Sequence, residues 1–197
     1  MIIDAHAHYT SAPPELQAYR GRQVTNMGRP TKGRLQVSDE QLERSMQGHL
    51  KRMADWGIDH LLFSPQASAM GHHFGSGLTS RYWTETCNDV IARISRLWPD
   101  KFSPVCQLPQ SPNVSPKSWL VELERCVNEL GFVSCNINPD ISGGVEPFTP
   151  SMGSEWWYPL WEKMVALDVP GTVHASATLN PAMHLTTAHY ISQHHSA

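Results

Sequence analysis

The chain has 197 residues, 40% of them hydrophobic, which suits one domain with a buried core. Its formal net charge is −3 without a Lys/Arg block, so binding to nucleic acid is not expected. No apolar stretch approaches the roughly 18 residues of a membrane span, and none forms a secretory signal, so neither membrane insertion nor secretion is expected. The four cysteines are far apart and form no CxxC pair, which favours a reduced, cytoplasmic protein.

The first predicted element is a short buried strand, Met1–His8. A long polar loop rich in Pro, Gly and Arg is expected from about Tyr9 to Val37. A helix follows, because Ser38 and Gln41 have capping-box spacing and Gly57 has the place of a C′ glycine. Its apolar residues recur at helical intervals, at Leu42, Met46, Leu50 and Met53.

Strands and helices then alternate along the chain. Further strands are expected at Ile58–Pro65, Phe102–Pro109, Phe132–Asp140 and Val169–Ala177. Helices are expected from about Ser80 to Trp98, from Ser115 or Ser118 to Gly131, and over residues 154–168. The tryptophans of these helices have core spacing, so we interpret them as packing residues.

This alternation predicts an α/β fold with a parallel sheet and helical crossovers. The loops after the strands are long and carry His, Asn, Asp and Gly, as in a (β/α)8 TIM barrel with its site at the C-terminal strand ends. An open doubly wound sheet is the alternative, although no glycine-rich phosphate turn follows the first strand. We expect residues 1–197 to form a single domain with about five strands and four to five helices, about three strands short of a barrel.

Two histidines lie at the end of the first predicted strand. His6 and His8 are at positions i and i+2, which share one face of a strand, so both imidazoles could ligate one metal ion. His174 ends the fifth predicted strand and would face the same barrel interior. Asp4 alternates onto the same side, where its carboxylate could accept the second N–H of a ligating imidazole; the alternative for Asp4 is a strand-end cap. The three histidines together predict a metal site.

The remaining histidines are interpreted differently. His184 follows the fifth strand by ten residues and could reach a substrate. Those assigned to structural positions, a Gly-rich loop or a polar tail are His49, His60, His72, His73, His194 and His195.

Polar side chains follow the second and fourth predicted strands. Ser64, Gln66 and Ser68 offer polar contacts after the second strand. Asn138 could hydrogen-bond a substrate carboxylate or carbonyl, and the alternative is turn chemistry before Pro139. The sequence carries no Ser-His-Asp pattern, phosphate loop or EF-hand.

Several segments together resemble one enzyme family. They are MIIDAHAHYT, FSPQASAM, CNDVIARI, QLPQSP, ELERCVNELGF, NINPD with SGG, WYPLWEKMVALDVP and VHASATLNPAMH. As a set they resemble the 4-oxalomesaconate hydratases of the amidohydrolase superfamily, in the branch that also holds metal-dependent decarboxylases. The resemblance runs from Met1 to about Tyr190.

The resemblance implies a distorted TIM barrel with one zinc ion, and it places His6, His8 and His174 among the metal ligands. It implies a lyase that adds water to an unsaturated tricarboxylic acid in the breakdown of lignin-derived protocatechuate and gallate. The metal would polarise a substrate oxygen or lower the pKa of a bound water. The residues expected near this small carboxylic acid are Gln66, Ser68, Asn138, His184 and Tyr190.

The chain departs from the family pattern in three places. Gln66 stands where the family has an arginine, and an amide supplies neither that charge nor its bidentate fork. VHASATL replaces IHVSGSC around His174, and the family segments expected beyond Tyr190, including a carboxylate for the metal and for proton transfer, are not found.

Two alternatives therefore stay open beside the hydratase. One is a decarboxylase or hydrolase of the same superfamily, and the other is a non-catalytic chain that only binds metal. A half-barrel would also expose strand edges and apolar faces, which allows homo-oligomers.

Overall fold

Five parallel strands form one sheet in the computed structural model, which describes residues 1–66, 74–175 and 179–181. The strands are β1 (Ile3–Tyr9), β2 (His60–Pro65), β3 (Phe102–Gln107), β4 (Ser134–Ile137) and β5 (Gly171–Val173). They lie in sequential order, and each pairs in parallel with the next. A doubly wound sheet would reverse this order at one point, so the arrangement confirms the predicted half of a TIM barrel.

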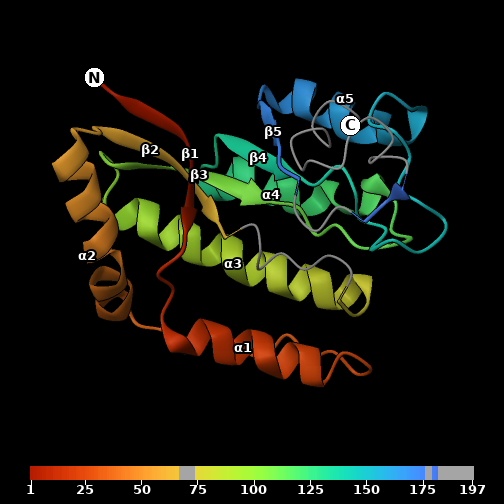
Figure 1. Ribbon diagram of the computed structural model, residues 1–197, viewed down its shortest axis with the longest axis horizontal. Coiled ribbons are helices and arrows are strands. Elements are labelled where there is room, and N and C mark those ends of the chain that lie inside the picture. The colour runs from red at the N-terminus through yellow and green to blue at the C-terminus, as the bar shows by residue number, and fades with distance from the viewer. Residues whose placement is uncertain (67–73, 176–178, 182–197) are drawn as a thin grey trace.

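Helices lie between the strands in the sequence; the third packs directly against the sheet, and the first lies outside the third (Figure 1). They are α1 (Pro14–Thr25), α2 (Asp39–Trp56), α3 (Gly77–Leu97), α4 (Leu120–Leu130) and α5 (Tyr158–Leu167). Short 3-10 helices, η2 (Pro116–Ser118) and η3 (Glu155–Trp157), precede α4 and α5. Among the described residues, no helix combines the length and the apolar character that a bilayer crossing needs.

The predicted capping residues fix the ends of α2. Ser38 Oγ accepts a hydrogen bond from the Gln41 backbone N–H at 3.3 Å, and Gln41 Oε1 accepts one from the Ser38 N–H at 2.8 Å. Gly57 ends the helix with a φ of 65°, a left-handed conformation that glycine adopts without a Cβ clash. These contacts confirm the predicted capping box and C′ glycine.

Other element boundaries differ from the prediction by a few residues. Helix α3 starts at Gly77, before the expected Ser80, because Ser76 Oγ accepts a hydrogen bond from the Thr79 N–H. Ser115 caps η2 instead of α4, so α4 begins only at Leu120. Each strand is shorter than expected, although β1 runs one residue beyond the expected His8, to Tyr9.

The expected loop from Tyr9 to Val37 contains α1, so the prediction of an irregular segment there is wrong. Pro14 lies in the first turn of α1, where its missing N–H would have no helical partner. Leu16 and Tyr19 pack against Trp83 of α3, with ring centroids of Tyr19 and Trp83 6.3 Å apart. This tertiary contact stabilises the helix. Its Arg, Gln and Gly residues give no helical pattern in the sequence.

The sheet curls so strongly that its two edges approach each other. β1 and β5 are at opposite edges, which four inter-strand spacings of ~4.8 Å would place about 19 Å apart in a flat sheet. However, Nε2 of His8 in β1 lies 2.9 Å from Nε2 of His174, the residue after β5. The five strands are therefore part of a barrel wall, and side chains from both edges meet inside it.

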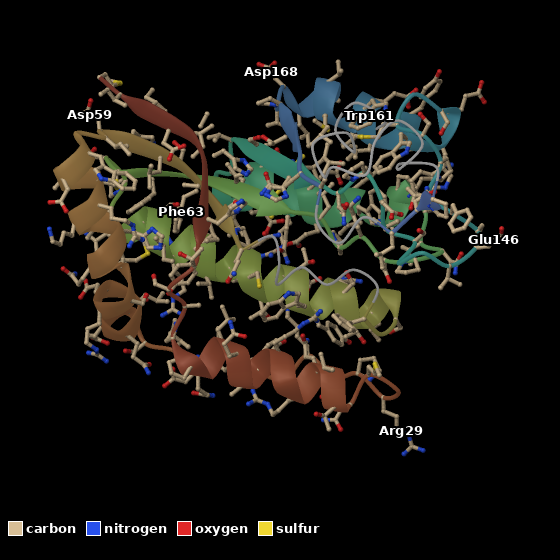
Figure 2. The ribbon with its side chains drawn as sticks, viewed as in Figure 1. Arg29, Asp59, Phe63, Glu146, Trp161 and Asp168 are labelled. Atoms are coloured by element: carbon tan, nitrogen blue, oxygen red, sulfur yellow. The ribbon has the colours of Figure 1, made fainter. Side chains whose placement is uncertain are left out.

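The apolar core lies between the sheet and the outer helices. Trp83, Trp119 and Trp157 are among the largest fully buried side chains, which confirms the interpretation of these tryptophans as packing residues. Phe63 of β2 lies inside the fold, whereas Arg29 and Glu146 lie at its periphery (Figure 2). All four cysteines are buried and unpaired.

His49 of α2 belongs to this core. It is 7% exposed, its ring packs edge-on against Phe63, and its Nδ1 accepts a hydrogen bond from Arg52 at 3.2 Å. Burial, and secondarily the charge of Arg52, lower the pKa of His49 to about 4. The contacts support the predicted structural role.

We expect His49 to make the fold less stable in acid. The unfolded chain binds this proton near pH 6.5 and the folded chain only near pH 4, so the free energy of unfolding falls as the pH drops through that window. Replacing His49 with Gln should reduce the loss between pH 7 and pH 5 by about 1–2 kcal/mol, as measured by urea unfolding. An equal loss in both chains would contradict this prediction.

Candidate metal centre

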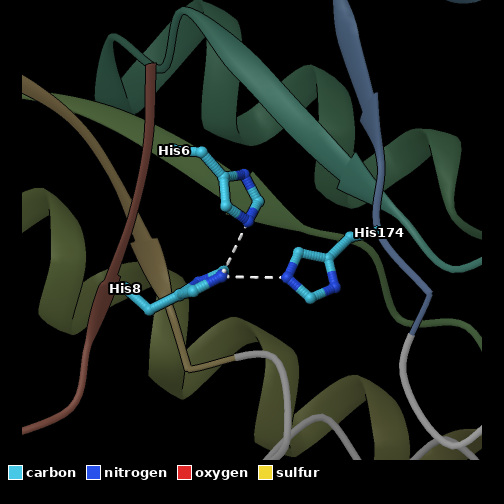
Figure 3. A group of neighbouring side chains, drawn as sticks. All are labelled: His6, His8 and His174. Atoms are coloured by element: carbon cyan, nitrogen blue, oxygen red, sulfur yellow. Dashed lines mark hydrogen bonds between the residues drawn. The ribbon is translucent and has the colours of Figure 1, made fainter. Parts of the chain in front are cut away.

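Three imidazoles meet at the C-terminal ends of the strands (Figure 3). Nε2 of His8 lies 3.0 Å from Nε2 of His6 and 2.9 Å from Nε2 of His174. His6 is exposed, and the other two rings are half-buried. No other group of His, Cys, Asp or Glu side chains in the described parts of the chain offers three donor atoms so close together. The structure thus brings together the three histidines that the sequence analysis selected.

A bulge in β1 affects how these side chains are aimed. The β1–β2 register pairs Asp4 with Leu61 but Ala7 with Phe63, so β1 holds one extra residue between the two pairs. A bulge redirects neighbouring side chains, and simple alternation from Asp4 onward does not hold across it. The Asp4 carboxylate accepts a hydrogen bond from the backbone N–H of His6 at 3.0 Å. The contact observed for Asp4 is therefore a local backbone cap, the second of the two predicted roles.

The Pro65 carbonyl and the Ser64 hydroxyl hold the ring of His8. Its Nδ1 lies 3.0 Å from the Pro65 carbonyl oxygen and 2.8 Å from Ser64 Oγ, which itself donates to the Ala7 carbonyl. A carbonyl oxygen only accepts hydrogen bonds, so Nδ1 of His8 carries the proton. Nε2 of the neutral ring then presents a lone pair to the other two imidazoles.

Burial keeps two of the rings neutral. It is the main cause that lowers the pKa of His8, followed by the nearby His6, while the Pro65 carbonyl and the Asp4 charge act in the opposite direction. Burial, then His8 and His6, lower the pKa of His174 to about 4. Both rings therefore resist protonation near neutral pH and keep lone pairs available.

This donor set fits a divalent transition metal. Zinc in catalytic sites takes three protein ligands and leaves a further position for water or substrate. Three imidazole nitrogens from β1 and the end of β5 supply that number, and the His8 tautomer leaves Nε2 free to bind.

Only some of the residues expected near the substrate lie in the described parts of the chain. Asn138 Oδ1 accepts a hydrogen bond from the Asp140 N–H at 3.1 Å, which is the predicted turn chemistry. Gln66 is half-buried directly after β2 and lines a small cavity with Tyr9 and Trp83. Residues of the prediction that lie outside the described parts of the chain are Ser68, His72, His73, His184, Tyr190, His194 and His195.

Two buried amide side chains extend the strand ends, and the sequence analysis missed both. Asn88 of α3 donates to the Gln107 carbonyl and accepts from the Gln107 N–H, each at 3.0 Å. Gln110 makes the same pair of contacts with the backbone of Asn138, at 2.9 and 2.8 Å. Each amide completes backbone hydrogen bonding where a strand ends. The one local signal that could have identified Asn88 is its position as a polar residue on the apolar face of α3.

Known proteins match the chain along most of its length. A sequence model of the amidohydrolase family matches residues 3–195. The 2-keto-4-carboxy-3-hexenedioate hydratase of Sphingobium sp. is 43% identical over 98% of this chain and 57% of its own length. The crystal structure of 4-oxalomesaconate hydratase from Rhodopseudomonas palustris aligns with a TM-score of 0.81 and 42% identity, over 89% of this chain and 53% of that one. These matches confirm the resemblance found in the sequence.

A more distant match is a decarboxylase. The gamma-resorcylate decarboxylase of Polaromonas sp. is 30% identical over 128 residues, which are 64% of this chain and 37% of the decarboxylase. The chain spans somewhat more than half the length of the two hydratases that it matches.

The chain should bind one divalent ion through the three imidazoles. Replacing His8 or His174 with Ala should weaken zinc binding by roughly 100-fold or more, beyond the 10–100-fold cost of losing a group behind a ligand. Competition with a coloured chelator at neutral pH measures this.

His60 is a matched control, because it also lies on a strand but hydrogen-bonds the Asp100 carbonyl and Ser103 away from the cluster. His60→Ala should bind zinc as the wild-type chain does. Unchanged affinity in the His8 and His174 variants would exclude the cluster as the metal site.

Proposed function

The chain belongs to the amidohydrolase family, and we propose that it serves as a metal-dependent hydratase, a lyase that adds water to the carbon–carbon double bond of an unsaturated tricarboxylic keto acid. The observation that carries this proposal is the meeting of three imidazoles in a chain that is 43% identical to a 2-keto-4-carboxy-3-hexenedioate hydratase over nearly its whole length. The hydroxyl group goes to one carbon of the double bond and the proton to its neighbour.

We infer a divalent metal at the cluster, and zinc as the ion, because imidazole donors and a small ligand number suit zinc. When bound, the metal supplies Lewis-acid polarisation of a substrate oxygen or a lowered pKa of its water. The chain's own part is orientation. The Pro65 carbonyl fixes the tautomer of His8, and burial holds His8 and His174 neutral.

In this proposal Gln66 contacts the substrate. Its amide can donate one hydrogen bond to a substrate carboxylate, but without a formal charge or a bidentate fork. Asn138 uses its carbonyl oxygen for the turn at Asp140, so we assign it to shaping the loop beside the substrate. Ser68, His184 and Tyr190 complete the proposed substrate contacts.

Decarboxylation is the second candidate function, and the match to a gamma-resorcylate decarboxylase favours it together with Gln66. That match covers 64% of the chain at 30% identity, against 98% at 43% for the hydratase. The hydratase is therefore the preferred proposal.

We place the activity in the cytoplasm and in the breakdown of lignin-derived aromatic compounds. Four buried, unpaired cysteines agree with a reducing compartment. Ile2 and Ile3, next to and in the edge strand β1, are about half exposed, which supports self-association as a further property.

The zinc-loaded chain should hydrate 2-keto-4-carboxy-3-hexenedioate. The reaction is measured as the loss of the absorbance of the conjugated double bond. His174→Ala should reduce turnover to background, and His60→Ala should leave it unchanged. Hydration that persists in His174→Ala would contradict the proposed site. Carbon dioxide release from 2,6-dihydroxybenzoate would favour the decarboxylase, and tight zinc binding without either reaction would favour a metal-binding chain without catalysis.

A further inference from the structure

One buried carboxylate joins two loops beside the histidine cluster. Asp140 lies three residues after β4 and is only 2% exposed. Its Oδ1 accepts hydrogen bonds from the Ser142 N–H at 3.0 Å, from Ser142 Oγ at 2.7 Å and from Thr149 Oγ1 at 3.0 Å. Its Oδ2 accepts from the backbone N–H groups of Leu179 and Asn180, both at 2.7 Å. Both oxygens of the side chain are therefore fully engaged.

The two oxygens have different partners in the fold. Oδ1 binds only the loop that follows β4, the segment to which Asp140 itself belongs. Oδ2 reaches across to residues 179–180, which follow β5. Hydrogen bonds from N–H groups to a carboxylate are short and roughly twice as strong as neutral ones, and a buried carboxylate depends on such partners. The carboxylate thus acts as a link between the β4 and β5 loops.

His174 lies between two attachments of the β5 segment to β4. On one side, β5 pairs with β4, and the His174 N–H donates to the Ile137 carbonyl at 2.8 Å. On the other side, Asp140 binds the backbone of Leu179 and Asn180, five and six residues later.

Asn180 adds a further link on this second side. Its Nδ2 donates to the Thr149 carbonyl at 3.1 Å. The chain on both sides of His174 is therefore tied to β4 or to the loop that follows it.

We propose that Asp140 is a positioning residue that holds residues 179–180, five and six residues after His174, and so aims the His174 imidazole at His6 and His8. Asp140 does not touch the cluster; it acts through the main chain that carries His174. The inference rests on the proposed metal site, because the alignment matters only if the three imidazoles bind one ion.

The chemistry of the link makes Asp140→Asn a sharp test. Every partner of the carboxylate is a donor, so both oxygens must accept. An amide of the same size carries no charge and replaces one acceptor by an NH2 group, which faces either the two backbone N–H groups of residues 179–180 or the backbone N–H of Ser142. The variant keeps the volume of the side chain but no longer offers an acceptor to every donor around it.

Ser142→Ala is the matched control. It removes a donor to Oδ1 and the acceptor for the Gly144 N–H, but it leaves in place the hydrogen bonds that the N–H groups of residues 179–180 donate to Oδ2. Both variants therefore disturb the β4 loop, and only Asp140→Asn removes the negative charge that strengthens the hydrogen bonds from residues 179–180.

Zinc affinity and the visible spectrum of the cobalt-substituted full chain are the readouts. We expect Asp140→Asn to weaken zinc binding about ten-fold, comparable to the loss of a group behind a ligand, and to change the cobalt ligand-field bands. Ser142→Ala should match the wild type in both. Equal affinity and spectra in Asp140→Asn and Ser142→Ala would overturn the inference. A wild-type chain that binds no metal would instead remove the proposed site and this inference with it.

Asn180→Ala decides the question if Asp140→Asn does not fold. It cuts the second link, to the Thr149 carbonyl, without disturbing a buried charge. We expect zinc affinity to fall several-fold and the amide hydrogens of residues 179 and 180 to exchange faster than in the wild-type chain. Neither change should occur in Ser142→Ala. Wild-type zinc affinity in Asn180→Ala would count against the positioning role.

Discussion

The Nε2 atoms of His8 and His174, from opposite edges of one sheet, lie 2.9 Å apart, and the rest of the structure depends on that approach. It requires the five strands to curl, because a flat sheet would separate β1 from β5 by far more than two histidine side chains can span. The outer helices stabilise the curved wall with buried tryptophans, while polar side chains gather at the C-terminal strand ends. Apolar packing thus supplies the shape on which the candidate metal chemistry relies.

Three side chains at those strand ends hydrogen-bond the backbone. Asn88 and Gln110 hydrogen-bond main-chain groups as a neighbouring strand would, and His8 is held by the Pro65 carbonyl. Buried polar atoms need such partners, since water does not reach them. The same contacts that satisfy these atoms also fix the strand ends, and so the places from which the imidazoles project.

The sequence predicts the parts of this architecture that local patterns encode. The capping box at Ser38, the glycine at position 57 and the paired histidines of β1 each follow from spacing within a few residues. Helix α1 does not, because its stability comes from Trp83, more than sixty residues away along the chain. The bulge in β1 and the bonds of Asp140 to residues 179–180 are likewise long-range, since each depends on another segment of the fold. The substrate residues beyond the described segments stay predictions.

The two supports of the histidine cluster differ in how they respond to mutation over evolutionary time. Part of the support of His8 is a main-chain oxygen, which every amino acid at position 65 carries, so this part persists as long as β2 keeps its path. The support next to β5 depends instead on one side chain, Asp140, and few single substitutions there preserve two acceptor oxygens of the right reach. Sequence drift can therefore loosen one side of the cluster while the other side is inherited with the fold.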